Sequence, residues 1–337
     1  MKRWFAFLVL MVCTVVFVIA SNESCMRIVT QWMYSGTGLL SSDRYRYGDL
    51  YGMTYLEQFK LPKDEQKLPL HKTDTLLRDV ELSVIGDSYT YSFLQEHPLT
   101  FQRTARYHFV QFEEHNALPL PSNSNRKKIV LIEVVERNAW NTLEVNVLKK
   151  CVATNPHEEP SKVFVEKPIE SNLDFLFFDH AVFTSIKQVK ADMNFQLFGK
   201  VSDGAVVSKD GQFLYLKETV SGNSTSNSFH SISKEEYATL ELRLNQINDY
   251  FTSKGFDEVW LVVAPNPARI LQTEGKTPNR LFDFLTNSKS LKLKFINLVP
   301  ILTKQAAQHF FRSDSHWNQQ GAALYREVIN QELIHLK

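Results

Sequence analysis

The chain has 337 residues, of which 43% are hydrophobic and 22% are charged, with a formal net charge of +1. This is the composition of an ordinary globular protein that can bury one large core, or one core with a substantial insertion. The near-neutral charge argues against a nucleic-acid partner, and no CxxC motif or His/Cys cluster has metal-ligand spacing, so we expect no metal or other cofactor.

The N-terminus departs from this average composition. Lys2 and Arg3 precede an uncharged apolar run over residues 4–20. A basic start before an apolar stretch is typical of a signal peptide, although the run is also just long enough to stay as a membrane anchor. We therefore expect an exported protein on the periplasmic or extracellular side of a membrane, with residues 1–21 either cleaved or retained as the anchor.

Residues 22–79 are polar and aromatic with little periodicity, and we expect them to form an N-terminal arm that packs on the core. This stretch contains Cys25, which could pair with Cys151 in an oxidising compartment. Two unpaired thiols are an equally good interpretation, and the sequence leaves both open.

Four short apolar runs, each followed by turn residues, indicate strands at residues 82–85, 129–135, 259–264 and 295–299. The second and third runs are almost continuously hydrophobic, which is typical of strands buried on both faces of a parallel sheet.

Helical patterns lie between and after these runs. Apolar residues recur at helical spacing over residues 234–253, after a capping box formed by Ser233 and Glu236. A last helix begins after Asn318 as its N-cap. Strands that alternate with helices predict a three-layer α/β/α fold with a central, mostly parallel sheet.

Residues 151–230 interrupt this alternation. They include a strand-like run at residues 175–179, a hairpin pattern around Asp210-Gly211, and a stretch rich in Ser and Asn at residues 221–228. We interpret this region as a β-rich insertion that ends in a mobile loop, and not as an independent domain.

A candidate nucleophile follows the first predicted strand, where residues 84–90 read VIGDSYT. Ligands of open α/β sheets bind beyond the carboxyl ends of the strands, and Ser88 lies there, after a turn formed by Gly86 and Asp87. Backbone N–H groups at a helix start can stabilise an oxyanion, so Gly86 joins the candidate oxyanion and substrate-binding residues. The alternative is that Ser88 only caps a helix.

A candidate base and its orienting carboxylate lie near the C-terminus, where residues 313–321 read SDSHWNQQG. Side chains two residues apart in an extended segment lie on the same side, which applies to Asp314 and His316. The carboxylate can hold one imidazole nitrogen while the other faces a serine. The alternative is a surface aspartate beside a solvated histidine, and Trp317 with the Asn318 cap weighs against it.

A third polar group ends the strand at residues 129–135, which is followed by Glu136, Arg137 and Asn138. The Asn138 amide could donate to an oxyanion, and Arg137 could bind an anionic or polyol group of a substrate. A strand end closed by a salt bridge is the alternative interpretation.

These residues resemble a known family. Gly86-Asp87-Ser88, the later Asp314-x-His316 and the polar Asn138 are similar to the SGNH (GDSL-type) hydrolase superfamily. More narrowly, residues 314–318 (DSHWN) resemble the DxHW element of alginate O-acetyltransferase-like proteins, and residues 209–214 (KDGQFL) resemble a segment found there. The resemblance implies a flavodoxin-like α/β/α fold, and ester hydrolysis or acyl transfer through a triad of Ser88, His316 and Asp314.

The chain departs from these patterns in three ways. The DxHW element precedes the serine in the alginate-type proteins, whereas it follows the serine here, as in typical hydrolases. Only one residue separates Asp314 from His316, where typical hydrolases have two. The superfamily's second-block glycine has no convincing equivalent, so the oxyanion hole is less well defined than the triad.

We therefore expect residues 80–337 to be the catalytic domain of an extracytoplasmic O-acyltransferase, with an acetyl group as one candidate cargo. Its acceptor would be a cell-surface or exported polysaccharide, and the resemblance implies a membrane-bound O-acyltransferase as a partner. A carbohydrate or lipid esterase with the same triad is the first alternative. A non-catalytic polysaccharide-binding or assembly protein is the second.

Overall fold

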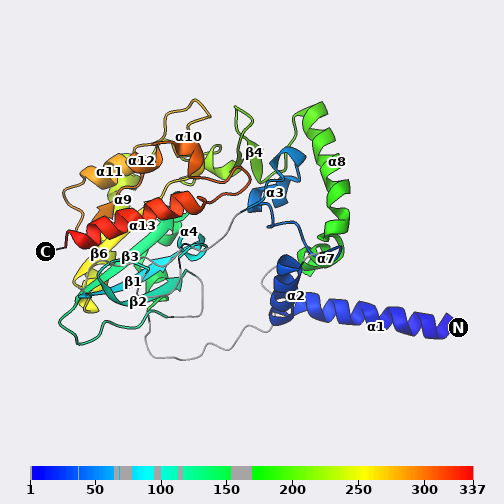
Figure 1. Ribbon diagram of the computed structural model, residues 1–337, viewed down its shortest axis with the longest axis horizontal. Helices are drawn as coiled ribbons and strands as arrows, with labels where there is room; N and C mark the ends of the chain where they lie inside the picture. Colours follow the sequence, from blue (N-terminus) through cyan, green and yellow to red (C-terminus); the bar gives the residue numbers. More distant parts are fainter. Residues whose placement is uncertain are drawn as a thin grey trace. The chain divides into compact units, whose positions relative to one another are not determined.

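The computed structural model describes residues 2–36, 38–63, 68, 78–94, 100–112, 117–152 and 169–336 (Figure 1). The chain divides into two compact units, of which unit 1 comprises residues 1–63 and 156–205, and unit 2 comprises residues 64–155 and 206–337. This division differs from the predicted one. Most of the predicted N-terminal arm and much of the predicted insertion belong together, in a unit of their own.

Unit 2 is built around a sheet of five parallel strands in the order β2-β1-β3-β6-β7. The strands are β1 (Val80–Gly86), β2 (Thr104–Gln111), β3 (Lys127–Val135), β6 (Glu258–Ala264) and β7 (Lys294–Ile296). Every residue of β1 and seven consecutive residues of β3 are buried. This is the burial expected for central strands of a parallel sheet, and the strand order is that of flavodoxin-like folds.

The four predicted strands are confirmed as β1, β3, β6 and β7, although β7 is shorter than predicted and Val299 starts the helix α12 (Val299–Leu302). Strand β2 was not predicted. It lies at the edge of the sheet, and exposed or half-buried residues interrupt its buried ones. An edge strand therefore lacks the continuous apolar run that marks its neighbours.

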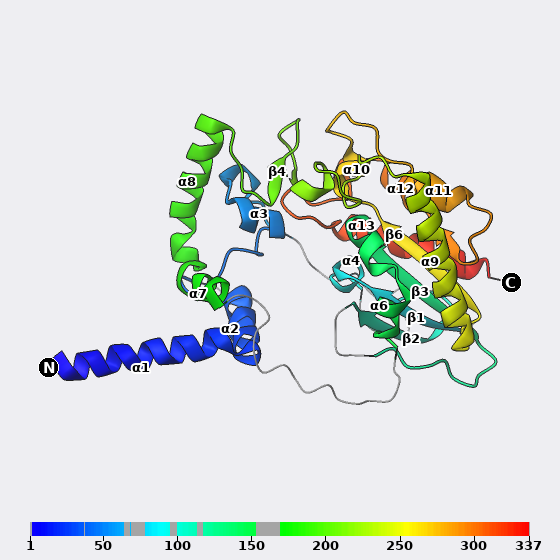
Figure 2. The ribbon, with the colours of Figure 1, turned by 180° about the vertical axis from the view of Figure 1, so that it is seen from behind.

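Helices cover both faces of this sheet (Figures 1 and 2). On one face α13 (Gln319–Ile334) packs with Tyr325 and Ile329 against Leu131 and Val262. On the other face α9 (Lys234–Ser253) packs with Leu244 against strand residues such as Ile132, and α11 (Leu281–Asn287) joins it. The predicted three-layer α/β/α architecture is confirmed.

Both predicted helices begin at their predicted caps. The Ser233 hydroxyl accepts from the Glu236 amide while the Glu236 carboxylate accepts from the Ser233 amide, which completes the capping box of α9. The Asn318 side chain accepts from the amides of Gln320 and Gly321 at the start of α13.

Shorter elements complete unit 2. They are α4 (Ser88–Tyr91), η2 (Glu136–Asn138), α5 (Ala139–Thr142), α6 (Val145–Lys149), η3 (Lys217–Thr219), α10 (Pro267–Leu271) and η4 (Ala306–Gln308). The predicted hairpin is also present, with β4 (Ala205–Val207) and β5 (Leu214–Leu216) on either side of the Asp210-Gly211 turn. Gly211 has a φ of 73°, a left-handed conformation that favours glycine.

Unit 1 is helical. Its elements are α1 (Lys2–Ser21), α2 (Glu23–Ser35), α3 (Asp49–Thr54), η1 (Glu57–Phe59), α7 (Ile169–Phe178) and α8 (Ala181–Phe198). The prediction of a β-rich insertion is therefore wrong for this part of it, because residues 175–178 end α7 instead of forming a strand. A short apolar run does not by itself distinguish a strand from a helical segment.

Helix α1 has the length and composition of a membrane span, with a mean hydropathy of 2.6 over Arg3–Ser21. Such a helix near an N-terminus is compatible with a signal peptide or an anchor. Cys13, Cys25 and Cys151 are all free cysteines.

Candidate active site

The start of α4 holds Ser88 at the carboxyl end of β1. Asp87 is the N-cap of this helix, and its carboxylate accepts from the Tyr89 amide at 2.8 Å and from the Val135 amide at 2.8 Å. Asp87 therefore ties the ends of β1 and β3 together, and Ser88 is the first helical residue, not the cap. Its amide belongs to the first turn, whose N–H groups have no acceptor within a helix.

Ser88, His316 and Asp314 form a continuous hydrogen-bonded chain. The Ser88 Oγ lies 2.6 Å from His316 Nε2, and His316 Nδ1 lies 2.6 Å from Asp314 Oδ1. The Asp314 side chain is 1% exposed and the His316 side chain 15% exposed. An ionised carboxylate only accepts hydrogen bonds, so it holds the proton on Nδ1 and leaves Nε2 to accept from the serine hydroxyl.

The loop before α13 explains how one intervening residue suffices between the aspartate and the histidine. Asp314 Oδ1 also accepts from the His316 amide at 3.0 Å, an Asx-type turn that folds the carboxylate back toward the imidazole. Phe310 and Trp317 form an isolated antiparallel bridge that closes the loop. The short spacing that departs from typical hydrolases is thus compatible with the same contact between carboxylate and imidazole.

Gly321 allows this loop to lie against the start of α13. A Cβ added at Gly321 would lie 2.5 Å from the His309 carbonyl oxygen and 2.7 Å from Trp317 Cβ. We expect Gly321→Ala to lower the free energy of unfolding by about 1–3 kcal/mol, as overpacking does in a filled core. Urea unfolding would measure this, with Gln320→Ala at the exposed neighbouring position as the control. Equal stabilities of the two variants would contradict the close packing.

Tyr89 and Trp317 hold the histidine loop against α4, and the sequence did not single out Tyr89. The Tyr89 hydroxyl donates to the Ser315 carbonyl, and the Trp317 indole Nε1 donates to the Tyr89 carbonyl at 2.9 Å. The Tyr89 ring centroid lies 4.7 Å from that of His316. These contacts place the His316 imidazole against α4, the helix that begins with Ser88.

Of the candidate oxyanion and substrate-binding residues, Arg137 contacts the site through Tyr89. Arg137 Nη1 donates to the Tyr89 hydroxyl at 3.3 Å, and the guanidinium lies 5.6 Å from the Tyr89 ring centroid, so Arg137 reaches the aromatic side of the site. In the part of the chain that the structure describes, Asn138 is exposed and makes no hydrogen bond to the triad. A Cβ at Gly86 would lie 3.1 Å from Glu133 Oε2 and from the Phe109 ring. The oxyanion roles of Asn138 and Gly86 stay predictions.

Glu133 lies directly beneath the serine turn. Its Oε2 accepts from the Asp87 amide at 3.1 Å and from the Thr90 hydroxyl at 2.9 Å. Burial of the carboxyl, and then the charge of Asp87, raise the pKa of Glu133 well above its ordinary value. A neutral Glu133 therefore supports the turn from inside the sheet.

This pKa makes the stability dependent on pH. In the unfolded chain Glu133 releases its proton near the ordinary value of 4.5, whereas the folded protein retains it, so stability falls as the pH rises from that value toward the folded pKa. A glutamine is neutral at every pH, so we expect Glu133→Gln to remove the contribution of this residue to the loss of stability with rising pH. The measurement compares the free energy of unfolding in urea at about pH 5 and about pH 8. Glu235→Gln, on the exposed side of α9, serves as the control and should keep the decline. Parallel pH profiles for wild type and Glu133→Gln would contradict this placement.

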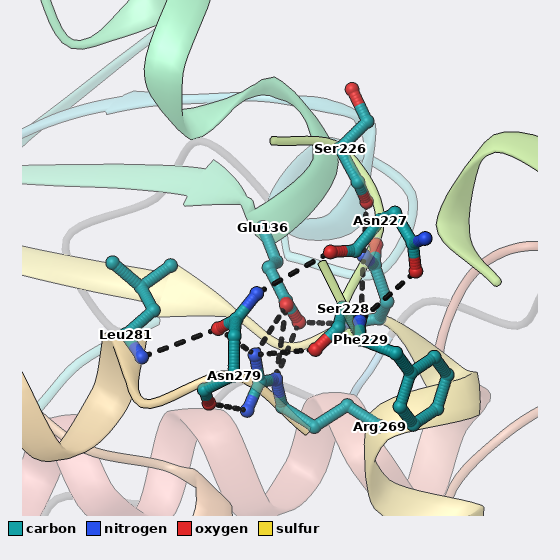
Figure 3. Close-up of polar contacts among 9 residues, drawn as sticks. Glu136, Ser226, Asn227, Ser228, Phe229, Arg269, Asn279 and Leu281 are labelled. Atoms are coloured by element: carbon teal, nitrogen blue, oxygen red, sulfur yellow. Dashed lines mark hydrogen bonds and ion pairs between the residues drawn. The ribbon is translucent and has the colours of Figure 1, made fainter. Parts of the chain in front are cut away.

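A buried ion pair stands behind the strand ends (Figure 3). The Arg269 guanidinium binds the Glu136 carboxylate through Nε at 2.9 Å and Nη2 at 2.7 Å, and the two side chains are 6% and 1% exposed. Arg269 also donates to Asn279, through Nη1 to the carbonyl at 2.9 Å and through Nη2 to Oδ1 at 2.6 Å. The prediction of a strand end closed by a salt bridge is thus confirmed for Glu136, with α10 as the source of the cation.

The same cluster orders the stretch rich in Ser and Asn, which we predicted to be a mobile loop. The Asn279 amide donates to the Ser228 carbonyl at 2.7 Å, and the Asn279 side chain donates to the Asn227 carbonyl at 3.3 Å (Figure 3). The Ser226 hydroxyl donates to the Arg137 carbonyl at 2.9 Å. These contacts attach the segment to Asn279 and to the residues that follow β3.

The structure therefore brings Ser88, His316 and Asp314 together and places Arg137 beside them through Tyr89. The segment after β1 packs on one face of the sheet, and the segment after β3 packs on the other face. The site lies between these two strand ends, which is where ligands bind in folds with this strand order. Such a chain of hydroxyl, imidazole and carboxylate can deprotonate a serine for attack on a carbonyl group. No protein-family model, curated protein or solved structure matches this chain.

Proposed function

We propose that this protein transfers acyl groups through an acyl-enzyme on Ser88. The observation that supports the proposal is the hydrogen-bonded chain from Ser88 Oγ through both nitrogens of His316 to the buried carboxylate of Asp314. A serine alone is a weak nucleophile, and this arrangement supplies the base and the group that orients the base. A structural role would need neither the short contact at Nε2 nor the buried carboxylate at Nδ1.

In the first half-reaction Ser88 Oγ attacks the acyl carbonyl of the donor, and its proton passes to His316 Nε2. The tetrahedral oxyanion forms near the Ser88 amide, whose N–H can donate to it. Asp314 stabilises the imidazolium. The intermediate collapses when the bond to the leaving group breaks, and the leaving group takes the proton from His316.

In the second half-reaction His316 takes the proton of an acceptor hydroxyl, whose oxygen attacks the acyl-serine. The bond to Ser88 Oγ then breaks, and Ser88 recovers the proton from His316. If the acceptor is water the product is a free acid, and if the acceptor is a sugar hydroxyl the product is an acylated glycan. Acceptor binding and exclusion of water separate the two outcomes.

We propose a glycan acceptor outside the cytoplasmic membrane, and therefore an O-acyltransferase. Two observations favour it: the apolar helix α1 at the N-terminus, and the DSHWN segment that resembles alginate O-acetyltransferase-like proteins. A membrane-bound O-acyltransferase that delivers the acyl group across the membrane would be the partner. Arg137, held beside Tyr89, is the candidate contact for a polyol or anionic group of the acceptor.

The test incubates the full-length protein with an activated acetyl ester, with and without an acidic or neutral oligosaccharide. We expect acetylated oligosaccharide by mass spectrometry, together with an acetyl group on the peptide that contains Ser88 after rapid quenching. Acetate release alone, unchanged by any oligosaccharide, would contradict the transferase and leave an esterase. Absence of both the acyl-enzyme and turnover would contradict catalysis itself.

A further inference from the structure

Helix α8 of unit 1 carries its large apolar side chains on the outside of the protein. Residues 182, 186, 189, 193 and 197 follow one another at steps of three or four, which places them on one face of the helix. They are 48–68% exposed, and we call this set the α8 stripe: Val182, Ile186, Val189, Met193 and Leu197. In an ordinary globular protein such a face packs on the core.

The opposite face of α8 is polar and is the one that contacts the protein. Thr184 and Gln188 are buried on that side. The Asp192 carboxylate accepts from the Glu57 amide at 3.2 Å, and Lys187 Nζ lies 3.0 Å from the Asp179 carboxylate. These contacts fix the rotation of the helix about its axis. The contacts of α8 with the rest of unit 1 therefore keep the α8 stripe on the outside.

The same unit contains the candidate membrane span α1, and direct contacts connect it to α8. The Asn172 side chain of α7 donates to the Ala20 carbonyl at the end of α1, at 2.8 Å. Phe175 of α7 packs with Met26 and Met33 of α2, and Ile19 of α1 joins this cluster. Two residues separate the end of α7 from the start of α8. The start of α8 is thus tied to the C-terminal end of α1.

The direction of α8 suits a membrane surface. In Figures 1 and 2 α8 begins near the C-terminal end of α1 and runs across the direction of α1, with α3 on the side away from the N-terminal end of α1. The polar contacts of α8 are made toward the segment that holds α3 and η1, so the α8 stripe faces the side into which α1 projects. If α1 crosses a bilayer, α8 lies along its surface with the stripe toward lipid.

We propose that α8 is an interfacial helix, embedded by the α8 stripe in the surface of the bilayer that α1 crosses. An amphipathic helix of this kind buries its apolar face at the boundary between headgroups and acyl chains, where basic side chains beside that face bind phosphate groups. Lys190 is exposed and adjacent to the stripe in the helical wheel. The exposed Phe177 and Phe178 of α7 add apolar surface, and the Phe178 ring centroid lies 6.1 Å from that of Phe183 in α8. The proposal concerns unit 1 alone and is independent of the acyl-transfer proposal.

The test uses the full-length protein reconstituted in phosphatidylcholine–phosphatidylglycerol vesicles that contain a phospholipid with a photoreactive group on its acyl chain. After illumination, mass spectrometry of peptides locates the lipid adducts. We expect adducts on residues 181–198 as well as on α1, which serves as the internal positive control. The outer face of α9, which carries an isolated exposed Leu242, should carry none.

Two matched variants distinguish a specific contact of α8 with lipid from nonspecific labelling of exposed apolar residues. Ile186→Glu combined with Val189→Glu should abolish the adducts on α8 while those on α1 remain unchanged, because a charged stripe no longer enters the acyl-chain region. Leu242→Glu should change neither. Adducts on α1 without any on α8 of the wild-type protein would overturn the proposal and leave a protein partner as the occupant of the stripe.

Discussion

Replacement of Ser88 by alanine is expected to reduce acyl transfer by about 10⁴- to 10⁶-fold, as loss of a nucleophile does in other serine-dependent enzymes. The change removes the oxygen that lies 2.6 Å from His316 Nε2 and leaves the helix start intact, since Asp87 is the cap. The free energy of unfolding should therefore change little. The measurement pairs initial rates on an acetyl ester with urea unfolding of the same preparation.

A serine outside the site provides the control for this variant. Ser253 is exposed at the end of α9, and Ser253→Ala should retain wild-type rates. The outcome also separates the proposed enzyme from a non-catalytic polysaccharide-binding protein. Full glycan acylation by cells that carry Ser88→Ala at a normal protein level would exclude catalysis by this residue.

Arg269→Met is expected to lower the free energy of unfolding by about 3–5 kcal/mol, which is the cost of leaving a buried carboxylate without its cation. Glu136 is 1% exposed and receives both the Nε and the Nη2 of Arg269, so no solvent replaces the lost partner. The variant also removes the guanidinium that binds Asn279. Equilibrium unfolding in urea, with signals from each unit followed separately, measures the effect.

The matched control is a pair of the same chemistry at the surface. Arg243 and Glu144 lie 2.8 Å apart, with side chains 33% and 40% exposed, and Arg243→Met should cost about 0–1 kcal/mol because water screens such pairs. A second variant tests the cause: adding Glu136→Gln to Arg269→Met removes the buried charge and should restore part of the loss. Similar costs for the two arginines would contradict the buried pair as a major source of stability.

The central sheet could be predicted because each of its inner strands is buried on both faces, which leaves an apolar run in the sequence. The contact among Ser88, His316 and Asp314 could be predicted because Ser88 follows a strand end and the other two residues closely precede a helix cap, features that are visible locally. Strand β2 escaped prediction since an edge strand keeps polar residues on its open side. Tyr89 escaped as well, because an aromatic residue inside a helix start usually indicates core packing.

The helical character of unit 1 was missed for a different physical reason. The apolar residues of α8 recur at helical spacing, yet they do not belong to the core of unit 2, and a short run such as residues 175–178 fits a strand equally well. The order of residues 221–228 was also invisible. Serine and asparagine are common in mobile loops, and the partners that hold them here, such as Asn266 and Asn279, lie some forty to fifty residues later in the chain.

The two halves of the site, Ser88 and His316, lie 228 residues apart along the chain, and four of the five strands of the sheet lie between them. Contacts between residues so far apart in sequence form late in folding, because the entropy of ordering the intervening chain is lost before the contacts contribute favourable free energy. As the proposed nucleophile, Ser88 would meet its base only when the segment before α13 docks on α4. In the proposed mechanism, acyl transfer therefore requires the complete sheet, and a partly folded chain would neither consume the acyl donor nor acylate itself.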